Sequence, residues 1–369
     1  MKRLFKGLAI SLATLVALTL ALELGLRASG FEPIVNPMGP RWMYRLDPEL
    51  GFALNPGFEG RHEHPEFATA IEIDARGFRD VAAGGEPRHR VLVLGDSMVF
   101  GFGVEAEETF CEVLQGDLGD VDVINAGTSG YGPKEQAVLL DRHLDALDPD
   151  AIVSSFFMAN DLEDVARVPQ TVRGGLIFSP DFAADIDRSP FRTFALERSR
   201  LALTLETKRV EALAGVRLGR PLEGLVPPGP DDLKPMTALP SLLRETPPEI
   251  EAAWAGVRAC YAAMAERAGD RPLLVVYMPV LHDVDPGRWE RQLEGHGIDP
   301  GTVDRDLPFA RLAGICEELG LELIDPRPAL TRDEGAWEFF FPYNQHLTVE
   351  GNRRLAEALR PAIERSLGR

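Results

Sequence analysis

A short apolar segment that ends in a glycine, an aspartate and a serine constrains the fold of this chain more than any other feature. Residues 90–94 (Arg-Val-Leu-Val-Leu) have the pattern of a strand covered on both faces, as in a parallel sheet. Gly95, Asp96 and Ser97 end that strand, and helix-favouring residues follow at 105–114. Ligands of open α/β sheets bind beyond the carboxyl ends of the strands, so Ser97 is predicted to lie where chemistry would occur.

The alternation of strand and helix continues along the chain. Further strands are predicted at 121–125, 151–157, 272–278 and 321–325, and helices at 134–147, 248–268, 309–319 and 348–367. Short loops between such elements are typical of right-handed βαβ units. We therefore expect an α/β domain with five strands, mainly parallel, whose polar ends meet in one crevice.

Composition excludes several classes of function. The chain has 58 acidic and 39 basic residues, and its formal net charge of −19 argues against a general affinity for nucleic acid or anionic lipid and disfavours a basic patch. Its three cysteines, Cys111, Cys260 and Cys316, are far apart and show neither a zinc spacing nor a disulfide framework. We expect no metal and no cofactor.

The first 30 residues have the pattern of a membrane anchor. Lys2, Arg3 and Lys6 precede an apolar run, and residues 7–26 make up about 20 positions, enough for a helix to cross a bilayer. Basic residues on the amino side predict a cytoplasmic N-terminus and an exported remainder. We expect a single-pass protein of a bacterial inner membrane with its main domain in the periplasm. The alternative is secretion after signal cleavage, since Thr19 and Ala21 form a passable cleavage site.

Two segments interrupt the regular pattern. Residues 31–88 are rich in Pro, Gly and aromatic residues and are predicted to be a juxtamembrane extension, with a strand at 66–74. Within it, His62 and His64, flanked by Glu63 and Glu66, are interpreted as a solvated polar patch. Residues 165–248, with one predicted helix at 194–218, form an insertion in the main domain (89–369) that is placed to act as a wall or lid.

Ser97 needs partners before it can act as a nucleophile. Val99 replaces the second glycine of G-x-S-x-G, and no Lys-Ser/Thr pair completes a phosphate-binding loop. A serine requires a base within hydrogen-bond reach and donors for a developing oxyanion. His346, just before the last helix, is the candidate base. The candidate donors are the backbone N–H groups of Ser97 and Gly130 and the side-chain amide of Asn160.

In this order, the blocks resemble those of the SGNH, or GDSL, hydrolase superfamily. They are Gly95-Asp96-Ser97, Gly130 in Asn-Ala-Gly-Thr-Ser-Gly, Asn160-Asp161, and His346 in His-Leu-Thr-x-x-Gly, and the resemblance covers about residues 90–369. It implies a three-layer α/β/α, flavodoxin-like domain and no metal. It also implies Ser97 as nucleophile, Gly130 and Asn160 as oxyanion-hole residues and His346 as base, with Asp96 and Asp161 as supporting residues.

The chain departs from the family pattern at two positions. Met158 stands where the third block usually has glycine, and Tyr343 stands where the catalytic aspartate precedes the histidine by three residues. Asn344, two before His346, occupies a position where some relatives place an acid. The missing carboxylate could come from elsewhere, or a backbone carbonyl could orient the ring of a Ser–His dyad. The candidate acids are Asp333, Glu334, Glu338 and Glu350.

The resemblance implies a serine esterase or O-acyltransferase that works through an acyl-enzyme. We expect its partner to be a small-molecule or glycan ester, such as a cell-envelope glycan or lipid, and we expect no nucleic acid. The alternative is a binding module for carbohydrate or a protein partner that kept the fold and lost the triad. The absence of an acid from residues 343–346 favours that alternative.

Overall fold

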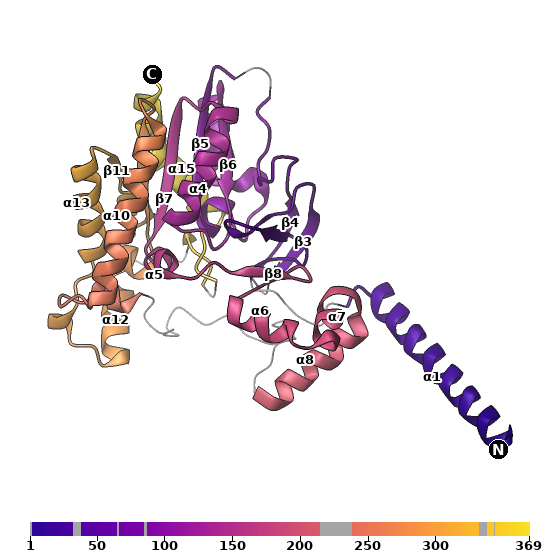
Figure 1. The fold of residues 1–369 in the computed structure, drawn as a ribbon. Coiled ribbons are helices and arrows are strands. Elements are labelled where there is room, and N and C mark those ends of the chain that lie inside the picture. Colours follow the sequence, from indigo (N-terminus) through magenta and orange to yellow (C-terminus); the bar gives the residue numbers. More distant parts are fainter. Residues whose placement is uncertain are drawn as a thin grey trace. The chain divides into compact units, whose positions relative to one another are not determined.

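The chain forms two compact units. The computed structural model describes residues 2–31, 38–64, 66–84, 87–214, 238–331, 338–342 and 344–369 (Figure 1). One unit, called here the sheet unit, comprises residues 54–167 and 225–369; the other, the helical unit, comprises residues 1–53 and 168–224. Each is described by itself.

The sheet unit is built on the predicted five-stranded parallel sheet. Its strands are β5 (His89–Gly95), β6 (Val121–Gly127), β7 (Ala151–Phe157), β10 (Leu273–Met278) and β11 (Glu322–Ile324), in the order β11-β10-β7-β5-β6. Val93 of β5 pairs with Asn125 of β6 on one side and with Val153 of β7 on the other. The serine after β5 therefore lies between the ends of two neighbouring strands.

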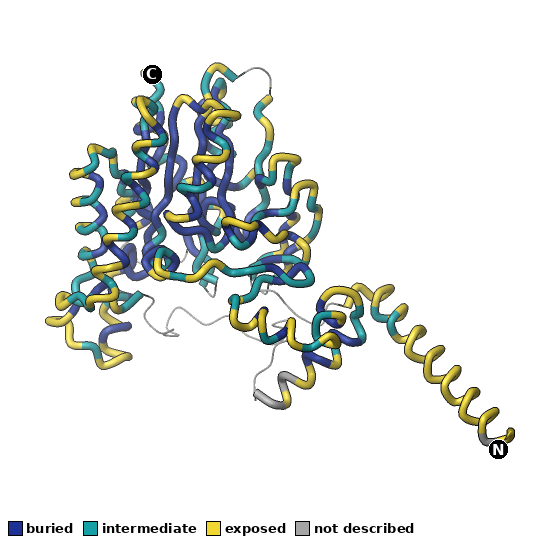
Figure 2. The backbone as a smooth tube through the Cα atoms, in the orientation of Figure 1, coloured by how far each residue is buried: buried dark blue, intermediate teal, exposed yellow. Residues whose placement is uncertain are grey.

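Helices cover both faces of the sheet, which confirms the predicted three-layer α/β/α fold. On one face α3 (Phe110–Leu118) and α15 (Val349–Ser366) pack together over an apolar cluster that includes Val91, Val93 and Val153. On the other face α10 (Pro248–Ala268) packs between α4 (Pro133–Leu147) and α13 (Leu307–Leu319). The central strands β7 and β10 are buried almost throughout (Figure 2), as a strand covered on both faces must be.

The remaining elements of the sheet unit are short. They are β3 (Glu59–His64), β4 (Phe67–Glu72), α2 (Ser97–Phe100), η1 (Ala106–Glu108), α5 (Asp161–Ala166), α9 (Leu239–Leu242), α11 (Leu281–Val284), α12 (Pro286–His296), η2 (Pro300–Thr302) and α14 (Arg327–Leu330). The helix predicted at 105–114 begins later, at Phe110, because the Thr109 side chain caps it by accepting from the N–H of Glu112. Helix α12 was not predicted, although Asp285 and Pro286 form a recognisable start.

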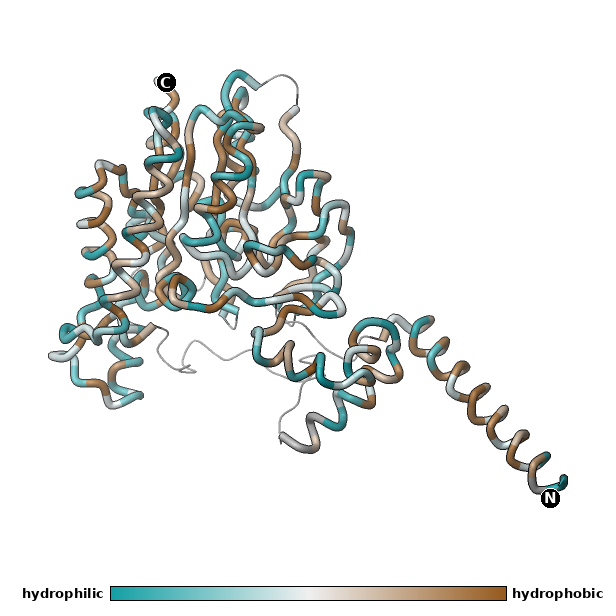
Figure 3. The backbone as a smooth tube through the Cα atoms, viewed as in Figure 1, coloured by the Kyte–Doolittle hydropathy of each residue, from teal (hydrophilic) through white to brown (hydrophobic). Residues whose placement is uncertain are grey.

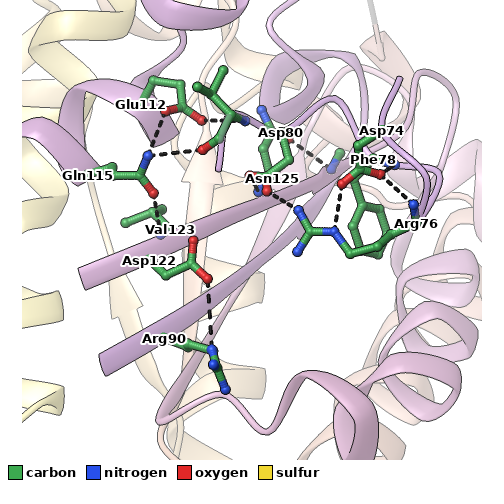
Figure 4. A network of polar contacts seen from close by, with 12 residues as sticks. Asp74, Arg76, Phe78, Asp80, Arg90, Glu112, Gln115, Asp122, Val123 and Asn125 are labelled. Atoms are coloured by element: carbon green, nitrogen blue, oxygen red, sulfur yellow. Dashed lines mark hydrogen bonds and ion pairs between the residues drawn. The ribbon is translucent and has the colours of Figure 1, made fainter. Parts of the chain in front are cut away.

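The side chains of Asp80 and Gln115 cover the outer edge of β6 (Figure 4). The carboxylate of Asp80 accepts from the backbone N–H of Asn125 at 2.9 Å and pairs with Arg76. Gln115 of α3 accepts from the N–H of Val123 at 3.1 Å and donates to the carbonyl of Val81 at 3.0 Å. These bonds satisfy edge groups that would otherwise be open to pairing with another strand.

A buried arginine joins the antiparallel hairpin of β3 and β4 to the segment that follows Ser97. The Arg79 guanidinium donates to the carbonyls of Gly101 and Val104, both at 2.7 Å, and to those of Phe100 and Ala70, both at 3.1 Å. Burial lowers the pKa of Arg79 to about 10, so the group keeps its charge at neutral pH. One side chain thus fixes the hairpin against the segment that follows Ser97.

The helical unit begins with α1 (Lys2–Ala28). Within the described residues, Phe5–Ala28 is the one stretch long and apolar enough to cross a membrane, and Figure 3 shows its apolar character. The unit continues with β1 (Tyr44–Asp47), β2 (Gly51–Leu54), β8 (Thr171–Arg173), β9 (Leu176–Phe178), α6 (Pro180–Asp187), α7 (Pro190–Arg198) and α8 (Arg200–Ala214). Its small core includes Leu176, Ile186, Leu196 and Leu203.

The prediction of a single helix at 194–218 is wrong in one respect, because the chain forms two helices there, α7 and α8. The chain breaks at Ser199, whose backbone is extended and whose hydroxyl accepts from the N–H of Ala202 at 3.0 Å. Ser199 therefore starts a new helix instead of continuing α7, because its side chain satisfies a backbone donor of the next first turn. Residues 215–218 of the predicted helix lie outside the described residues.

The Arg79→Met substitution should destabilise the sheet unit by about 3 kcal/mol, because it leaves several buried carbonyls without a donor. Urea unfolding at pH 7, followed by circular dichroism, measures the change. The matched control is Arg61→Met on the same hairpin, where the arginine side chain is 59% exposed. That variant should stay within about 0.5 kcal/mol of the wild type. Equal stability of the two variants would contradict the role of Arg79.

Candidate active site

Ser97 lies at the first turn after β5, held by its neighbours. The Asp96 carboxylate caps α2 by accepting from the N–H of Met98 at 2.9 Å. Gly95 has no room for a side chain, since a Cβ there would lie 2.2 Å from both Ser155 Oγ and Val99 Cγ2. The turn therefore packs tightly against β7, and the serine hydroxyl remains partly exposed.

His346 lies within hydrogen-bond distance of Ser97. Its Nε2 atom lies 2.7 Å from Ser97 Oγ, although 249 positions separate the two residues. The loop before α15 carries the histidine and is closed by backbone bonds from Phe341 N–H to the His346 carbonyl and from Gln345 N–H to the Phe341 carbonyl, both 2.8 Å. The ring of Phe102 packs against the imidazole at a centroid distance of 4.8 Å.

Asn344 occupies the position of the missing acid. Its side-chain oxygen Oδ1 is hydrogen-bonded to His346 Nδ1. Because an amide oxygen can only accept, the Nδ1 atom carries the proton and Nε2 is left as an acceptor for the Ser97 hydroxyl. This is the tautomer that a general base requires. An amide provides the orientation without the negative charge of a carboxylate.

The other candidate acids lie elsewhere or outside the described residues. Asp333, Glu334 and Tyr343 are outside them. Glu350 pairs with Arg353 and Arg354 on α15, and Glu338 is exposed, with its backbone carbonyl bound by Thr348. Among the described residues, the group bound to His346 Nδ1 is therefore the Asn344 amide.

A carboxylate does reach the histidine loop, from the hairpin. Glu66 Oε2 accepts from the backbone N–H of Asn344 at 2.7 Å, and the Glu66 side chain is only 5% exposed. The neighbouring Phe67 ring packs against Phe341 of the same loop at 5.4 Å. The hairpin thus holds the loop through one charge-assisted hydrogen bond and one aromatic contact.

The interpretation of this segment as a solvated patch is wrong for His62, His64 and Glu66, although Glu63 is exposed. His62 is buried, with its ring 4.6 Å from that of Phe102 and 5.3 Å from that of Phe67, and His64 stacks on Phe67 at 4.7 Å. Alternating polar residues hid this, because the aromatic partners come from distant segments. Within the described part of the chain, no three His, Cys, Asp or Glu side chains are arranged to hold a metal.

The surroundings of His346 favour its neutral form. Burial lowers the pKa of His346 to about 4, a hydrogen bond to Asn344 opposes that shift, and the charges of His62 and His64 add to it. The ring is therefore neutral at pH 7 and gains a proton only as the pH falls through about 4. A neutral imidazole can take a proton from Ser97.

Gly130 and Asn160 lie after β6 and β7, the two neighbours of β5, and one ion pair links them. Gly130 adopts a left-handed backbone with φ of 84°. Arg167 donates to the Gly130 carbonyl at 3.0 Å and pairs with Asp164 at 2.7 Å, and Asp164 accepts from Asn160 Nδ2 at 2.7 Å. This bond uses one of the two amide hydrogens of Asn160 and leaves the other for a ligand.

Carboxyl groups gather around these strand ends. Burial raises the pKa of Asp96 to about 7. Burial also raises the pKa of Asp164 to about 7, although the positive charge of Arg167 lowers it. Burial, then the charges of Asp96 and Asp164, raise the pKa of Asp161 well above its ordinary value. Asp161 accepts from the N–H of Phe157 at 2.9 Å, and the Ser97 hydroxyl lies 3.5 Å from Asp96, farther than from His346. Asp96 and Asp161 shape the turns that present Ser97 and Asn160.

Three residues of the site were missed by the sequence analysis. Arg167 and Asp164 could have been suspected, because an i,i+3 acid–base pair follows the Asn160-Asp161 block directly. Glu66 carries no such signal, because nothing local relates residue 66 to residue 344. Its place depends on the packing of the hairpin.

Together the fold and these contacts define a serine–histidine site at the strand ends of a parallel α/β sheet. No family model matches the chain, and no curated protein matches it in sequence. A solved structure titled as a lipolytic protein of the G-D-S-L family from Desulfitobacterium hafniense is similar at 13% identity and a TM-score of 0.37, covering 74% of this chain and 99% of that one.

Two further solved structures are similar at the same level. A lipase/acylhydrolase from Enterococcus faecalis has 13% identity and a TM-score of 0.39, covering 75% of this chain and 95% of its own. A carbohydrate acetylesterase family member from Sinorhizobium meliloti has 16% identity and a TM-score of 0.35, covering 76% and 100%. The activity named for each belongs to that protein.

His346 should titrate near pH 4, and Asn344→Asp should raise its pKa by more than one unit, because a carboxylate beside Nδ1 favours the imidazolium. NMR of the protein with ¹³C-labelled histidine measures both titrations, with the signal assigned by its loss in His346→Gln. A His346 pKa that stays unchanged in Asn344→Asp would contradict the contact between the two side chains.

Proposed function

We propose that the chain is a serine esterase that acts on O-acyl esters through an acyl-enzyme. Ser97 is the nucleophile, His346 the general base, and Gly130 and Asn160 the oxyanion-hole residues. The observation that carries the proposal is the chain of contacts from Ser97 Oγ to His346 Nε2 and from His346 Nδ1 to Asn344 Oδ1. A hydroxyl bonded to an oriented neutral imidazole is the arrangement that nucleophilic catalysis requires.

Every proton transfer of the reaction passes between His346 and either Ser97, the leaving alcohol or the attacking water or hydroxyl. Ser97 Oγ bonds to the ester carbonyl carbon while its proton passes to His346 Nε2, and the carbonyl oxygen becomes an oxyanion that N–H donors stabilise. The tetrahedral species expels the alcohol, which takes the proton from His346 and leaves the acyl group on Ser97. Water or an acceptor hydroxyl then attacks the acyl carbon and gives its proton to His346. The bond between the acyl carbon and Ser97 Oγ breaks, His346 returns the proton to Ser97 Oγ, and the acid or a new ester is released.

The absence of an aspartate changes the electrostatics of the proton transfer. A carboxylate beside the imidazole normally stabilises the cation formed in the transition state, whereas Asn344 contributes only a dipole. Glu66 places a carboxylate one residue contact away from the imidazole, because it accepts from the Asn344 backbone N–H. We infer that Glu66 supports the histidine from this second position.

Residues 7–26 would anchor the protein in a membrane. We propose a single-pass protein with its catalytic residues outside the cytoplasm, because basic residues precede the apolar helix. The substrate class that suits this place is an ester of a cell-envelope glycan or lipid. Hydrolysis and acyl transfer use the same acyl-enzyme and differ in the hydroxyl that accepts the acyl group.

The alternative of a binding module has less support in the site. A module that had lost catalysis would have no need for a 2.7 Å contact between Ser97 and His346, or for an acceptor at Nδ1. Both contacts are present although Tyr343 stands at the position of the family's aspartate. We also propose the domain organisation predicted from the sequence, which has a juxtamembrane extension at 31–88 and an insertion at 165–248 in the main domain.

A fluorophosphonate probe should label the purified protein on Ser97. Ser97→Ala should abolish labelling, and His346→Ala should slow it by about 10²-fold or more, because the base is removed. Ser366→Ala, which changes a serine at the end of α15, is the matched control and should label like the wild type. Labelling that survives in folded Ser97→Ala protein would refute the proposal.

Glu66→Gln should lower kcat for a p-nitrophenyl ester about fivefold to tenfold, because a charge-assisted hydrogen bond becomes a neutral one. KM should change little, since Glu66 contacts the histidine loop and not a substrate. Glu63→Gln changes the neighbouring acid, whose side chain is 80% exposed, and should match the wild type. Equal kcat values for the two variants would remove Glu66 from the catalytic network.

A further inference from the structure

One face of α7 exposes aromatic and basic side chains. Phe191 and Phe194 are each 50% exposed, and Arg188 and Arg198 are exposed at either end of the helix. Phe191, Phe194 and Arg198 are three and four positions apart and share one side of α7, and Arg188, the C-cap of α6, lies just before the helix. The opposite side, with Ala195 and Leu196, is buried in the core of the helical unit. We call these four exposed residues the α7 stripe.

The α7 stripe lies beside the end of the apolar helix α1. Arg27, in the last turn of α1, donates to the backbone carbonyl of Arg198 at 2.7 Å. Glu23 of α1 accepts from the N–H groups of Arg200 at 3.2 Å and Leu201 at 2.9 Å, and from the Ser199 hydroxyl at 3.0 Å. The start of α8 is thus capped by a carboxylate from the apolar helix.

These contacts fix the depth of α7 if α1 spans a bilayer. Arg27 and Ala28 end the candidate span, so the junction of α7 and α8 lies at the boundary between hydrocarbon and water. Phenylalanine side chains bury favourably at that boundary, and arginine side chains there reach lipid phosphates. The position of the α7 stripe and its residue types therefore both suit contact with a bilayer surface.

The two units differ in formal charge. Lys2, Arg3 and Lys6 lie at the end of α1 that is proposed to be cytoplasmic, and the rest of the helical unit contains 12 basic and 11 acidic residues, a formal charge of +1, although the whole chain carries −19. The remainder of the chain, with 24 basic and 47 acidic residues, carries −23. The part of the helical unit on the side of α7 therefore does not share the strong negative charge of the remainder of the chain.

We propose that the α7 stripe is a lipid-binding surface that docks on an anionic bilayer beside the anchor. Phe191 and Phe194 enter the interface, and Arg188 and Arg198 contact anionic headgroups. The proposal rests on the membrane anchorage proposed above, and it adds a second, peripheral contact with the bilayer. The helices after residue 180 are thereby held against the membrane surface.

Hydrogen exchange of the full chain tests whether the α7 stripe docks on an anionic bilayer. The protein is placed in nanodiscs of phosphatidylcholine alone, in nanodiscs with 30% phosphatidylglycerol, and in lipid-free amphipol. Amides of 191–198 should exchange about tenfold more slowly in the anionic nanodiscs than in amphipol. Phe191→Ser/Phe194→Ser should remove this protection. Arg188→Gln/Arg198→Gln should remove the difference between the two lipid compositions.

Val349→Ser is the matched control, because Val349 is a similarly exposed apolar residue of the sheet unit, and it should leave exchange at 191–198 unchanged. Equal exchange in amphipol and nanodiscs, or protection that survives the double phenylalanine substitution, would overturn the proposal. Protection in amphipol would show that the stripe is covered by protein instead. Resistance of the full chain to carbonate extraction tests anchorage separately, and fluorophosphonate labelling tests catalysis.

Discussion

The hydrogen bond between Ser97 and His346 depends on the parallel order of the sheet. Parallel strands bring all their carboxyl ends to one edge, so β5, β6 and β7 present Ser97, Gly130 and Asn160 from adjacent positions. The histidine arrives from the far end of the chain, on the loop that leads into α15. Close packing at Gly95 leaves the serine turn little freedom, and the 2.7 Å contact is the result.

The surroundings of the histidine set its protonation state and its tautomer. Aromatic rings of Phe102 and the hairpin remove water from the imidazole, which keeps it neutral, while the Asn344 amide fixes its tautomer. In a site with an aspartate, one residue would supply both orientation and charge. Here Asn344 supplies the orientation, and Glu66 supplies a charge through the backbone of Asn344.

Local patterns were sufficient to predict most of the fold. Apolar runs such as 151–157 identified the central strands, and α10 and α15 ended within two residues of their predicted limits. Ser97 and His346 could be paired because each follows a predictable strand or precedes a predictable helix. Glu66 could not be found, since its role depends on a contact 278 positions away, and the burial of His62 depends likewise on distant aromatic rings. The start of α8 at Ser199 depends on a single hydroxyl, which hydrophobic periodicity does not detect.

The contact between Glu66 and Asn344 has a consequence for an exported chain. Translocation proceeds from the N-terminus, so the hairpin with Glu66 leaves the cytoplasm long before the loop with His346. A chain whose last 30 residues are still inside has a serine without its base. If the chain is exported as proposed, Ser97 therefore meets His346 only after the last residues have crossed the membrane, and a chain that stops before residue 346 has the serine without its base.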